Sequence, residues 1–418
     1  MPIILFLYGV LPAVQIFAFL QGRAAYNVSD AVNYSSSILL FHWVLANVLL
    51  ASKIPWFQRL VPYDARVRLH ILASAGIALA LSFHVTYKIL MGKWIDLVSW
   101  SLLAMMAVLL FLAVLWVPIP GFRAFRHLVH SWLGSLSYDR SKKIHSFILI
   151  FATVLILLHV AQADLFSQVP PWSAIFYLAL YLSALAGHLI ARVGLFRTKA
   201  TVIRTERRRD IVVLYLHPHR SFHFRSGQFA FLRVKLPSHK MEEHPFSILS
   251  TPQEPVITLA IRALGDFTKD LEHLPPGSQV SLNGGYGNFY PRGESPLCFI
   301  ASGIGMVPCI SILKSLQESR ESRPILFFLA VHDLEGLPER ERLEAIPRDL
   351  PNVHLRILTS NPPGPRFGKT FFQHEIPDPR SFSYFLCSSS KVRQTVIQAL
   401  HALGVQNRVI HYETFTLG

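Results

Sequence analysis

Long apolar stretches alternate with short polar ones over the first half of the chain. Six stretches lie near residues 1–20, 35–52, 68–90, 97–117, 143–163 and 173–195. Each is long enough to cross, as a helix, a membrane core of about 30 Å. After about residue 200 the pattern changes to short apolar runs separated by turn residues, as in DIVVLYLHPH, QFAFLRVKL and VITLAIRAL. The pattern therefore predicts a membrane half followed by a globular half.

The globular half has two patterns of its own. Its first runs predict a small antiparallel barrel. From about residue 296, strands alternate with helices: LCFIASG, CISILKSLQ, ILFFLAVH, VHLRILTS and YFLCSSS. That alternation is typical of an α/β domain with a mostly parallel sheet. We therefore expect an all-α six-helix transmembrane domain over 1–196, an antiparallel β-barrel over 197–294, and an α/β nucleotide-binding domain over 295–418.

Composition supports the membrane interpretation. The chain of 418 residues is 51% hydrophobic and has a net charge of +15, with a mean hydropathy of +0.37. The short loops at 53–68 and 118–143 carry most of the basic residues, whereas the alternate loops carry Arg23, Lys88 and Lys93. The positive-inside rule then places both termini in the cytoplasm. We expect a multi-pass plasma-membrane protein (the inner membrane in a bacterium) that contacts lipid and no nucleic acid.

Two smaller features fit this picture. The first 20 residues lack the basic start and the cleavage site of a signal peptide, so they are expected to remain as a helix. The basic run TERRRD (Thr205–Asp210) follows the last apolar stretch and is interpreted as facing anionic lipid. Three cysteines, Cys298, Cys309 and Cys387, form neither a disulfide framework nor a zinc site.

Paired histidines stand out in two of the apolar stretches. His70 and His84 are fourteen residues apart, and so are His145 and His159. Fourteen residues place both histidines on one helix face, about 21 Å apart along the axis. If these parallel helices are neighbours, His70 meets His145 near the cytoplasmic side and His84 meets His159 near the outer side. Two facing imidazoles are good axial ligands for haem, although a hydrogen bond to a helix carbonyl is the alternative for any one histidine.

The barrel region contains residues suited to a flavin. In HPFSILS, Phe246 offers an aromatic surface and Ser247 offers a hydroxyl donor. In IRALGDFTKDL, Arg262 and a turn at Gly265 precede Thr268, which we expect to open a short helix whose N-terminus favours phosphate. A β-turn or an ordinary helix cap is the alternative interpretation of each motif.

The segment LCFIASGIGMVPCISIL has the strand, glycine turn and helix that bind a dinucleotide pyrophosphate. Gly303 and Gly305 permit close backbone approach, and Pro308 suits a first helical turn. Cys387 is expected at a strand end, where sheet ligands lie. The chain ends in HYETFTLG, in which Phe415 could cover a flavin face or simply pack in the core.

In these motifs and their order, nearly the whole chain resembles the superfamily of NADPH oxidases and transmembrane ferric reductases. The resemblance implies two haem b groups on the four paired histidines and a cytosolic ferredoxin-reductase-like module that binds FAD and NADPH or NADH. It assigns FAD to the residues of the HPFS and GDFT regions: His244, Pro245, Phe246, Ser247, Arg262, Gly265 and Thr268. It assigns the nicotinamide nucleotide to Gly303, Gly305, Pro308 and Cys387. The catalytic candidates are Cys387, Glu413 and Phe415, the last stacking on the flavin until nicotinamide displaces it.

The implied function is electron transfer from NAD(P)H through FAD and two haems to oxygen at the outer face, with superoxide as the product. A ferric-chelate reductase, or a donor to a separate outer-face protein, is the alternative. Two departures keep these choices open. Ser360 stands where the family often has an arginine for the 2′-phosphate, so His332 or Arg366 is a possible substitute. Lys88 stands where oxidases often have a histidine. We expect no obligatory soluble activator.

Overall fold

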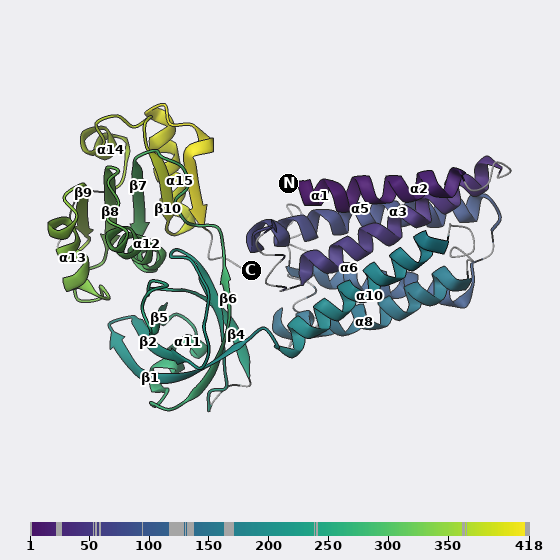
Figure 1. The fold of residues 1–418 in the computed structure, drawn as a ribbon, viewed down its shortest axis with the longest axis horizontal. Helices are drawn as coiled ribbons and strands as arrows, with labels where there is room; N and C mark the ends of the chain where they lie inside the picture. Colours follow the sequence, from purple (N-terminus) through teal and green to yellow (C-terminus); the bar gives the residue numbers. More distant parts are fainter. Residues whose placement is uncertain are drawn as a thin grey trace. The chain divides into compact units, whose positions relative to one another are not determined.

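The computed structural model describes residues 2–21, 27–52, 54, 57, 60–93, 95–116, 129, 131, 138–162, 171–237, 239, 241–361, 364 and 366–413. The chain divides between Leu195 and Phe196 into two compact units. The first unit is helical, and the second contains the strands (Figure 1).

A helix lies at each of the six apolar stretches of the first unit. The first segment is continuous and runs through α1 (Pro2–Leu5), η1 (Phe6–Val10) and α2 (Leu11–Gln21). The others are α3 (Val28–Ala51), α5 (Tyr63–Leu90), α6 (Leu97–Trp116), α8 (Tyr138–Gln162) and α10 (Pro171–Val193). The Asn27 side chain caps α3 by accepting from the Asp30 amide at 2.8 Å, which explains where this helix begins.

Several of these helices are long and apolar enough to cross a membrane. Within the described residues, four helical stretches meet that criterion: Pro2–Gln21, Val28–Ala51, Ala65–Leu90 and Arg140–Gln162. Shorter apolar helices occur at Leu97–Ala113 and Leu178–Ala191. Helix α5 packs mainly on α3, and α8 mainly on α6. A bundle of six membrane-crossing helices stays a prediction.

The first lobe of the second unit is an antiparallel sheet with the order β4-β3-β6-β1-β2-β5. Its strands are β1 (Thr198–Arg208), β2 (Ile211–Pro218), β3 (Phe229–Val234), β4 (Glu242–Ser247), β5 (Ile257–Arg262) and β6 (Gln279–Tyr286). A bridge between Ile248 and Leu259 joins the two edges of this sheet, so it curls into a barrel around an apolar interior. The predicted antiparallel barrel is confirmed.

The second lobe is a parallel five-stranded sheet with the order β11-β10-β7-β8-β9. Its strands are β7 (Leu297–Ser302), β8 (Ile325–Val331), β9 (Val353–Thr359), β10 (Ser383–Cys387) and β11 (Ile410–Glu413). The main helices are α12 (Met306–Glu318), α13 (Arg340–Asp349), α14 (Lys369–Glu375) and α15 (Ser390–Ala402). The central strand β7 is apolar along most of its length because both faces of a parallel sheet are covered by helices. The predicted α/β topology is confirmed.

Helix α12 connects the two lobes of this unit. Lys314 of α12 is fully buried. Its ammonium donates to the Leu249 carbonyl at 3.2 Å and lies 2.9 Å from a Glu254 oxygen and 2.7 Å from a Glu339 oxygen. Leu249 and Glu254 lie between β4 and β5 of the barrel, whereas Glu339 precedes α13. One apolar core also runs from β2 of the barrel to β7 and α12, so the lobes form a single unit.

Replacing Lys314 by methionine is expected to destabilise this unit by about 3 kcal/mol, because two partly buried carboxylates lose the ammonium that lies between them. In a unit of this size that corresponds to a fall of roughly 6–12 °C in melting temperature. The rise in flavin fluorescence as FAD is released on heating measures the melting temperature. The control, Lys369→Met at the exposed start of α14, should shift the melting temperature by less than about 2 °C; equal effects of the two variants would contradict the role given to Lys314.

Candidate functional site

The turn after β7 holds the predicted nucleotide-binding glycines in the second unit. Gly303 has a positive φ of 53°, a conformation that costs side-chain-bearing residues about 1 kcal/mol or more. Gly305 meets the end of β10: a Cβ atom on it would lie 2.0 Å from the Cys387 carbonyl oxygen. Pro308 lies buried in the first turn of α12. The glycine turn is therefore held against β10 by backbone contact.

Cys387 and Glu413 lie side by side at the ends of β10 and β11. They are register partners in the parallel sheet, and both are buried. Burial raises the pKa of the Cys387 thiol well above its ordinary value, so the thiol is neutral at physiological pH and is unsuited to act as a nucleophile or a base. Phe415, predicted to cover the flavin, lies outside the described residues.

The HPFS motif forms most of β4, which pairs antiparallel with β3. The His244 ring packs on Phe267 with a centroid distance of 4.2 Å, and His244 Nε2 lies 2.8 Å from a Glu242 oxygen. Pro245 and Phe246 pair with Phe231 and Ala230 of β3. The motif is thus a strand and not a turn.

Two buried hydroxyls near this strand have no hydrogen-bond partner among the described residues. They are Ser247 Oγ, at the end of β4, and Ser226 Oγ, in the turn before β3. An unpaired buried hydroxyl costs free energy unless a ligand satisfies it. The predicted role of Ser247 as a hydroxyl that bonds FAD fits this observation.

The GDFT region contains a helix cap. The short helix α11 (Asp266–Asp270) follows Gly265, and Thr268 Oγ1 accepts from the amides of Leu264 and Gly265 at 3.0 Å. It also donates to the Gly265 carbonyl at 2.9 Å. The helix opens at Asp266, two residues before the predicted start, because Thr268 is the residue that closes the cap.

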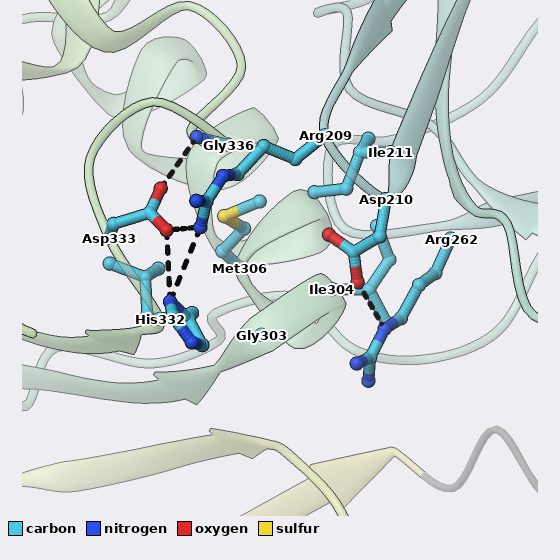
Figure 2. Close-up of a pocket in the computed structure, with 11 residues that line it drawn as sticks. Arg209, Asp210, Ile211, Arg262, Gly303, Ile304, Met306, His332, Asp333 and Gly336 are labelled. Atoms are coloured by element: carbon cyan, nitrogen blue, oxygen red, sulfur yellow. Dashed lines mark hydrogen bonds and ion pairs between the residues drawn. The ribbon is translucent and has the colours of Figure 1, made fainter. Parts of the chain in front are cut away.

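Arg262, predicted to hold FAD, lines a pocket shared with the nucleotide-binding turn. Its Nε lies 2.7 Å from a carboxylate oxygen of Asp210. The pocket has a volume of ≈ 330 Å³ and lies between the β1–β2 turn of the barrel and the ends of β7 and β8. Figure 2 shows Arg209, Asp333 and His332 in contact on one side of it, and Asp210 with Arg262 on the other.

The end of the basic run at Thr205–Asp210 contributes Arg209 and Asp210 to this pocket. Arg207 pairs with Glu272, and Arg209 pairs with Asp333. Arg209 occupies the tight β1–β2 turn with a φ of 54°, an uncommon conformation for a residue with a side chain. Because their partners are acids of the same unit, the charges of these two arginines are partly balanced within it, and contact of the run with lipid stays a prediction. The positive φ is invisible in the sequence.

In the first unit, the two histidines of α5 have their Nδ1 atoms engaged. His70 Nδ1 lies 3.2 Å from the Asn47 carbonyl oxygen, which can only accept. His84 Nδ1 lies 3.0 Å from Ser36 Oγ, and that hydroxyl already donates its hydrogen to the Asn33 carbonyl. Both imidazoles therefore carry their proton on Nδ1, and each keeps its Nε2 lone pair for a ligand.

The histidines of α8 resemble them. His159 Nδ1 lies 3.0 Å from Ser99 Oγ, and His145 hydrogen-bonds to the backbone of Leu109. Across the two helices, His145 interacts electrostatically with His70, and His84 with His159. These contacts join the histidines that the spacing pairs, and the role of the pairs as haem ligands stays a prediction. The described residues contain no cluster of three or more His, Cys, Asp or Glu side chains suited to a metal ion alone, and two histidines per site would suit the iron of a haem.

Comparison with known proteins identifies the first lobe of the second unit. Residues 196–288 match the family model described as an FAD-binding domain. This range runs from the first residue of the unit to just beyond β6. The match supports the prediction that this barrel binds FAD.

Related proteins include reductases. The ferredoxin–NAD(P)(+) reductase component of the naphthalene 1,2-dioxygenase system of Pseudomonas putida is 26% identical over 231 residues, which are 53% of this chain and 69% of that protein. Phenol hydroxylase P5 protein of Acinetobacter pittii is 31% identical over 211 residues (47% and 59%). The flavohemoprotein of Halalkalibacterium halodurans is 22% identical over 214 residues (46% and 52%).

The chain spans between 52% and 69% of the length of these three relatives. The matches support the coarser part of the predicted activity, a flavin-dependent oxidoreductase that takes electrons from NAD(P)H. The roles of individual residues, and the transmembrane haem part, stay predictions.

Gly305→Ala is expected to lower the rate of flavin reduction by NAD(P)H by about a hundredfold, because the new methyl group would force the nucleotide turn away from β10. Anaerobic stopped-flow absorbance measures this rate. Gly303→Ala is the control. A Cβ atom there meets nothing within 4 Å, so only the cost of its positive φ applies, about 1 kcal/mol. A normal rate in Gly305→Ala would contradict the close contact between Gly305 and the end of β10.

The three thiols should resist iodoacetamide in the native protein at pH 8. Burial raises the pKa of Cys298, Cys309 and Cys387, so almost no thiolate forms, whereas an unfolded cysteine is about one quarter ionised at this pH. Intact-mass measurement before and after unfolding in denaturant counts the labels. Rapid native labelling of Cys387 would show that it is accessible and ionised.

Proposed function

We propose that this chain transfers electrons from NAD(P)H through FAD and two haem b groups across a membrane to oxygen, producing superoxide on the outer side. The observation that carries the proposal is that three of the four histidines of α5 and α8, namely His70, His84 and His159, have their Nδ1 atoms in hydrogen bonds. When bound, FAD supplies the change from two-electron hydride transfer to single-electron transfer, and the haems carry single electrons. The protein, with both termini cytoplasmic, is expected to work without a soluble activator.

The chain's own residues position each group. His70 with His145 would hold the inner haem, and His84 with His159 the outer one. A hydrogen bond on Nδ1 fixes the tautomer and the orientation of a ligating imidazole. Ser36 therefore acts as a positioning residue for His84.

FAD would occupy the side of the barrel around β4. Ser247 and Ser226 would donate their free hydroxyls to it, and Phe246 would contribute an aromatic surface. Gly303, Gly305 and Pro308 would bind the nicotinamide nucleotide at the start of α12. Because its thiol is neutral, Cys387 would shape this site by contact and not by proton transfer.

Because two histidines would hold each haem iron, we expect the acceptor to take its electron without binding the metal. Lys88 lies one turn after His84 and interacts electrostatically with both His84 and His159. A cation at this position would stabilise a product that gains negative charge. This favours an acceptor that is reduced to an anion, as oxygen is to superoxide.

The deciding experiment uses the full-length protein in detergent. Anaerobic addition of NADH or NADPH should bleach the flavin and produce the sharp bands of reduced haem. Mixing with oxygen should then reoxidise the haems within seconds and yield superoxide, measured by its suppression with superoxide dismutase. If the haems react slowly with oxygen but rapidly reduce a ferric chelate, the acceptor is the ferric chelate and not oxygen. A preparation without a Soret band would refute the haem proposal.

His84→Ala is expected to lose one of the two haems and the superoxide activity, yet to keep reduction of flavin by NAD(P)H at its normal rate. Haem content per flavin, from the pyridine haemochrome assay, measures the loss. Ser82→Ala is the matched control: Ser82 lies on the same helix, is exposed, and donates to the Ala78 carbonyl at 2.9 Å. This control should keep both haems. Loss of flavin reduction in a well-folded His84→Ala protein would contradict the proposed order.

A further inference from the structure

We infer that the cluster formed by Arg209, His332 and Asp333 binds the adenosine ribose of the nicotinamide nucleotide and selects NADH over NADPH. The inference rests on the proposed function for its nucleotide and adds the specificity that the motifs leave open. It starts from the pocket at the ends of β7 and β8, shown in Figure 2.

The topology places this cluster beside the nucleotide turn. Strands β7 and β8 are parallel neighbours, with Ser302 opposite Ala330. Gly303 therefore follows the first strand, and His332 and Asp333 follow the second, at the same edge of the sheet. In sheets of this kind the pyrophosphate lies at the glycine turn after the first strand, and an acidic residue beyond the next strand accepts from the ribose hydroxyls of NAD.

Asp333 is rigidly held. One carboxylate oxygen accepts from the amides of Glu335 and Gly336 at 3.1 and 3.2 Å. The other contacts Arg209 and lies 2.9 Å from His332 Nδ1. The Asp333 side chain is only 14% exposed, so it cannot turn away from a ligand. A carboxylate fixed in this way is a good acceptor for a ribose hydroxyl and a poor neighbour for a phosphate.

The charges around Arg209 also disfavour a 2′-phosphate. Its guanidinium pairs with Asp333 and lies 3.7 Å from a Glu335 oxygen, so two carboxylates already balance its charge. The 2′-phosphate of NADPH would bring about two further negative charges to this place. It would have to displace Asp333 from Arg209 or lie against an uncompensated carboxylate.

Neither residue named as a substitute for the family arginine brings a free cation to the pocket. His332 is tied to Asp333 and to Arg209. Arg366 is not among the described residues that line the pocket. Ser360, at the family arginine's position, donates its amide to the carbonyls of Val331 and His332 at 3.1 and 3.2 Å, so it braces the loop without adding charge.

The test compares both nucleotides on the full-length protein. Anaerobic flavin reduction should show a kcat/KM for NADH at least about tenfold above that for NADPH, because a charge clash of this kind is worth more than one factor of ten. Asp333→Asn removes the charge but keeps an oxygen for the two loop amides. It should lower KM for NADPH, raise KM for NADH because the ribose loses its charged acceptor, and so reduce the preference by about tenfold. The matched control is Asp349→Asn, which removes an exposed carboxylate bonded to Gln317.

A preference for NADPH in the unaltered protein, or an unchanged ratio in Asp333→Asn, would overturn the inference. Calorimetric binding of NAD⁺ and NADP⁺ separates this failure from failure of the proposed function. If neither nucleotide reduces the flavin, the proposed electron path is wrong, and tighter binding of NAD⁺ still supports the ribose site. Equal binding, or no binding of either nucleotide, overturns the ribose site itself.

Discussion

The architecture of the second unit depends on one buried ammonium group. Lys314 lies in α12, and its charge is balanced by Glu254 from the barrel and Glu339 from the sheet lobe. A buried cation requires such partners, because desolvation would otherwise be costly. Since α12 begins at the glycine turn, the same contacts set the position of that turn relative to the barrel. A nucleotide at the turn and a flavin on the barrel need this fixed geometry for hydride transfer.

The candidate cofactor sites share a physical feature. Each contains hydroxyl groups or imidazole nitrogens that can bind a ligand. Ser226 and Ser247 bury hydroxyls that have no partner among the described residues. The Nδ1–H groups of His70 and His84 donate hydrogen bonds to protein acceptors. The Nε2 lone pair of each ring is then left for a ligand. In a well-packed interior such groups are normally satisfied. Their presence at positions that the motifs identify supports the proposed flavin and haem sites.

The division of labour between protein and cofactor also follows from burial. The candidate thiol at the end of β10 is neutral, because burial raises its pKa. The backbone of Gly305 lies close against the carbonyl oxygen of Cys387. The chemistry of the proposed reaction would then lie with FAD and the nucleotide, while the chain contributes shape, hydrogen bonds and charge. The pairs Arg209–Asp333 and Arg262–Asp210 place that charge at the pocket beside the glycine turn.

The sequence by itself determined the element types, because hydrophobic period and glycine position report local structure. It predicted the helices, the barrel strands and the α/β lobe, and its histidine pairs of α5 and α8 stay a prediction. It could not show that Arg209 meets Asp333, since these residues are far apart in the chain and join only when the barrel packs on the sheet lobe. It could not show that Thr268 closes a helix cap, or that Lys314 is buried between two glutamates. Periodicity encodes which face of an element is apolar, whereas ion pairs between elements depend on how those faces pack, and only the tertiary structure decided that.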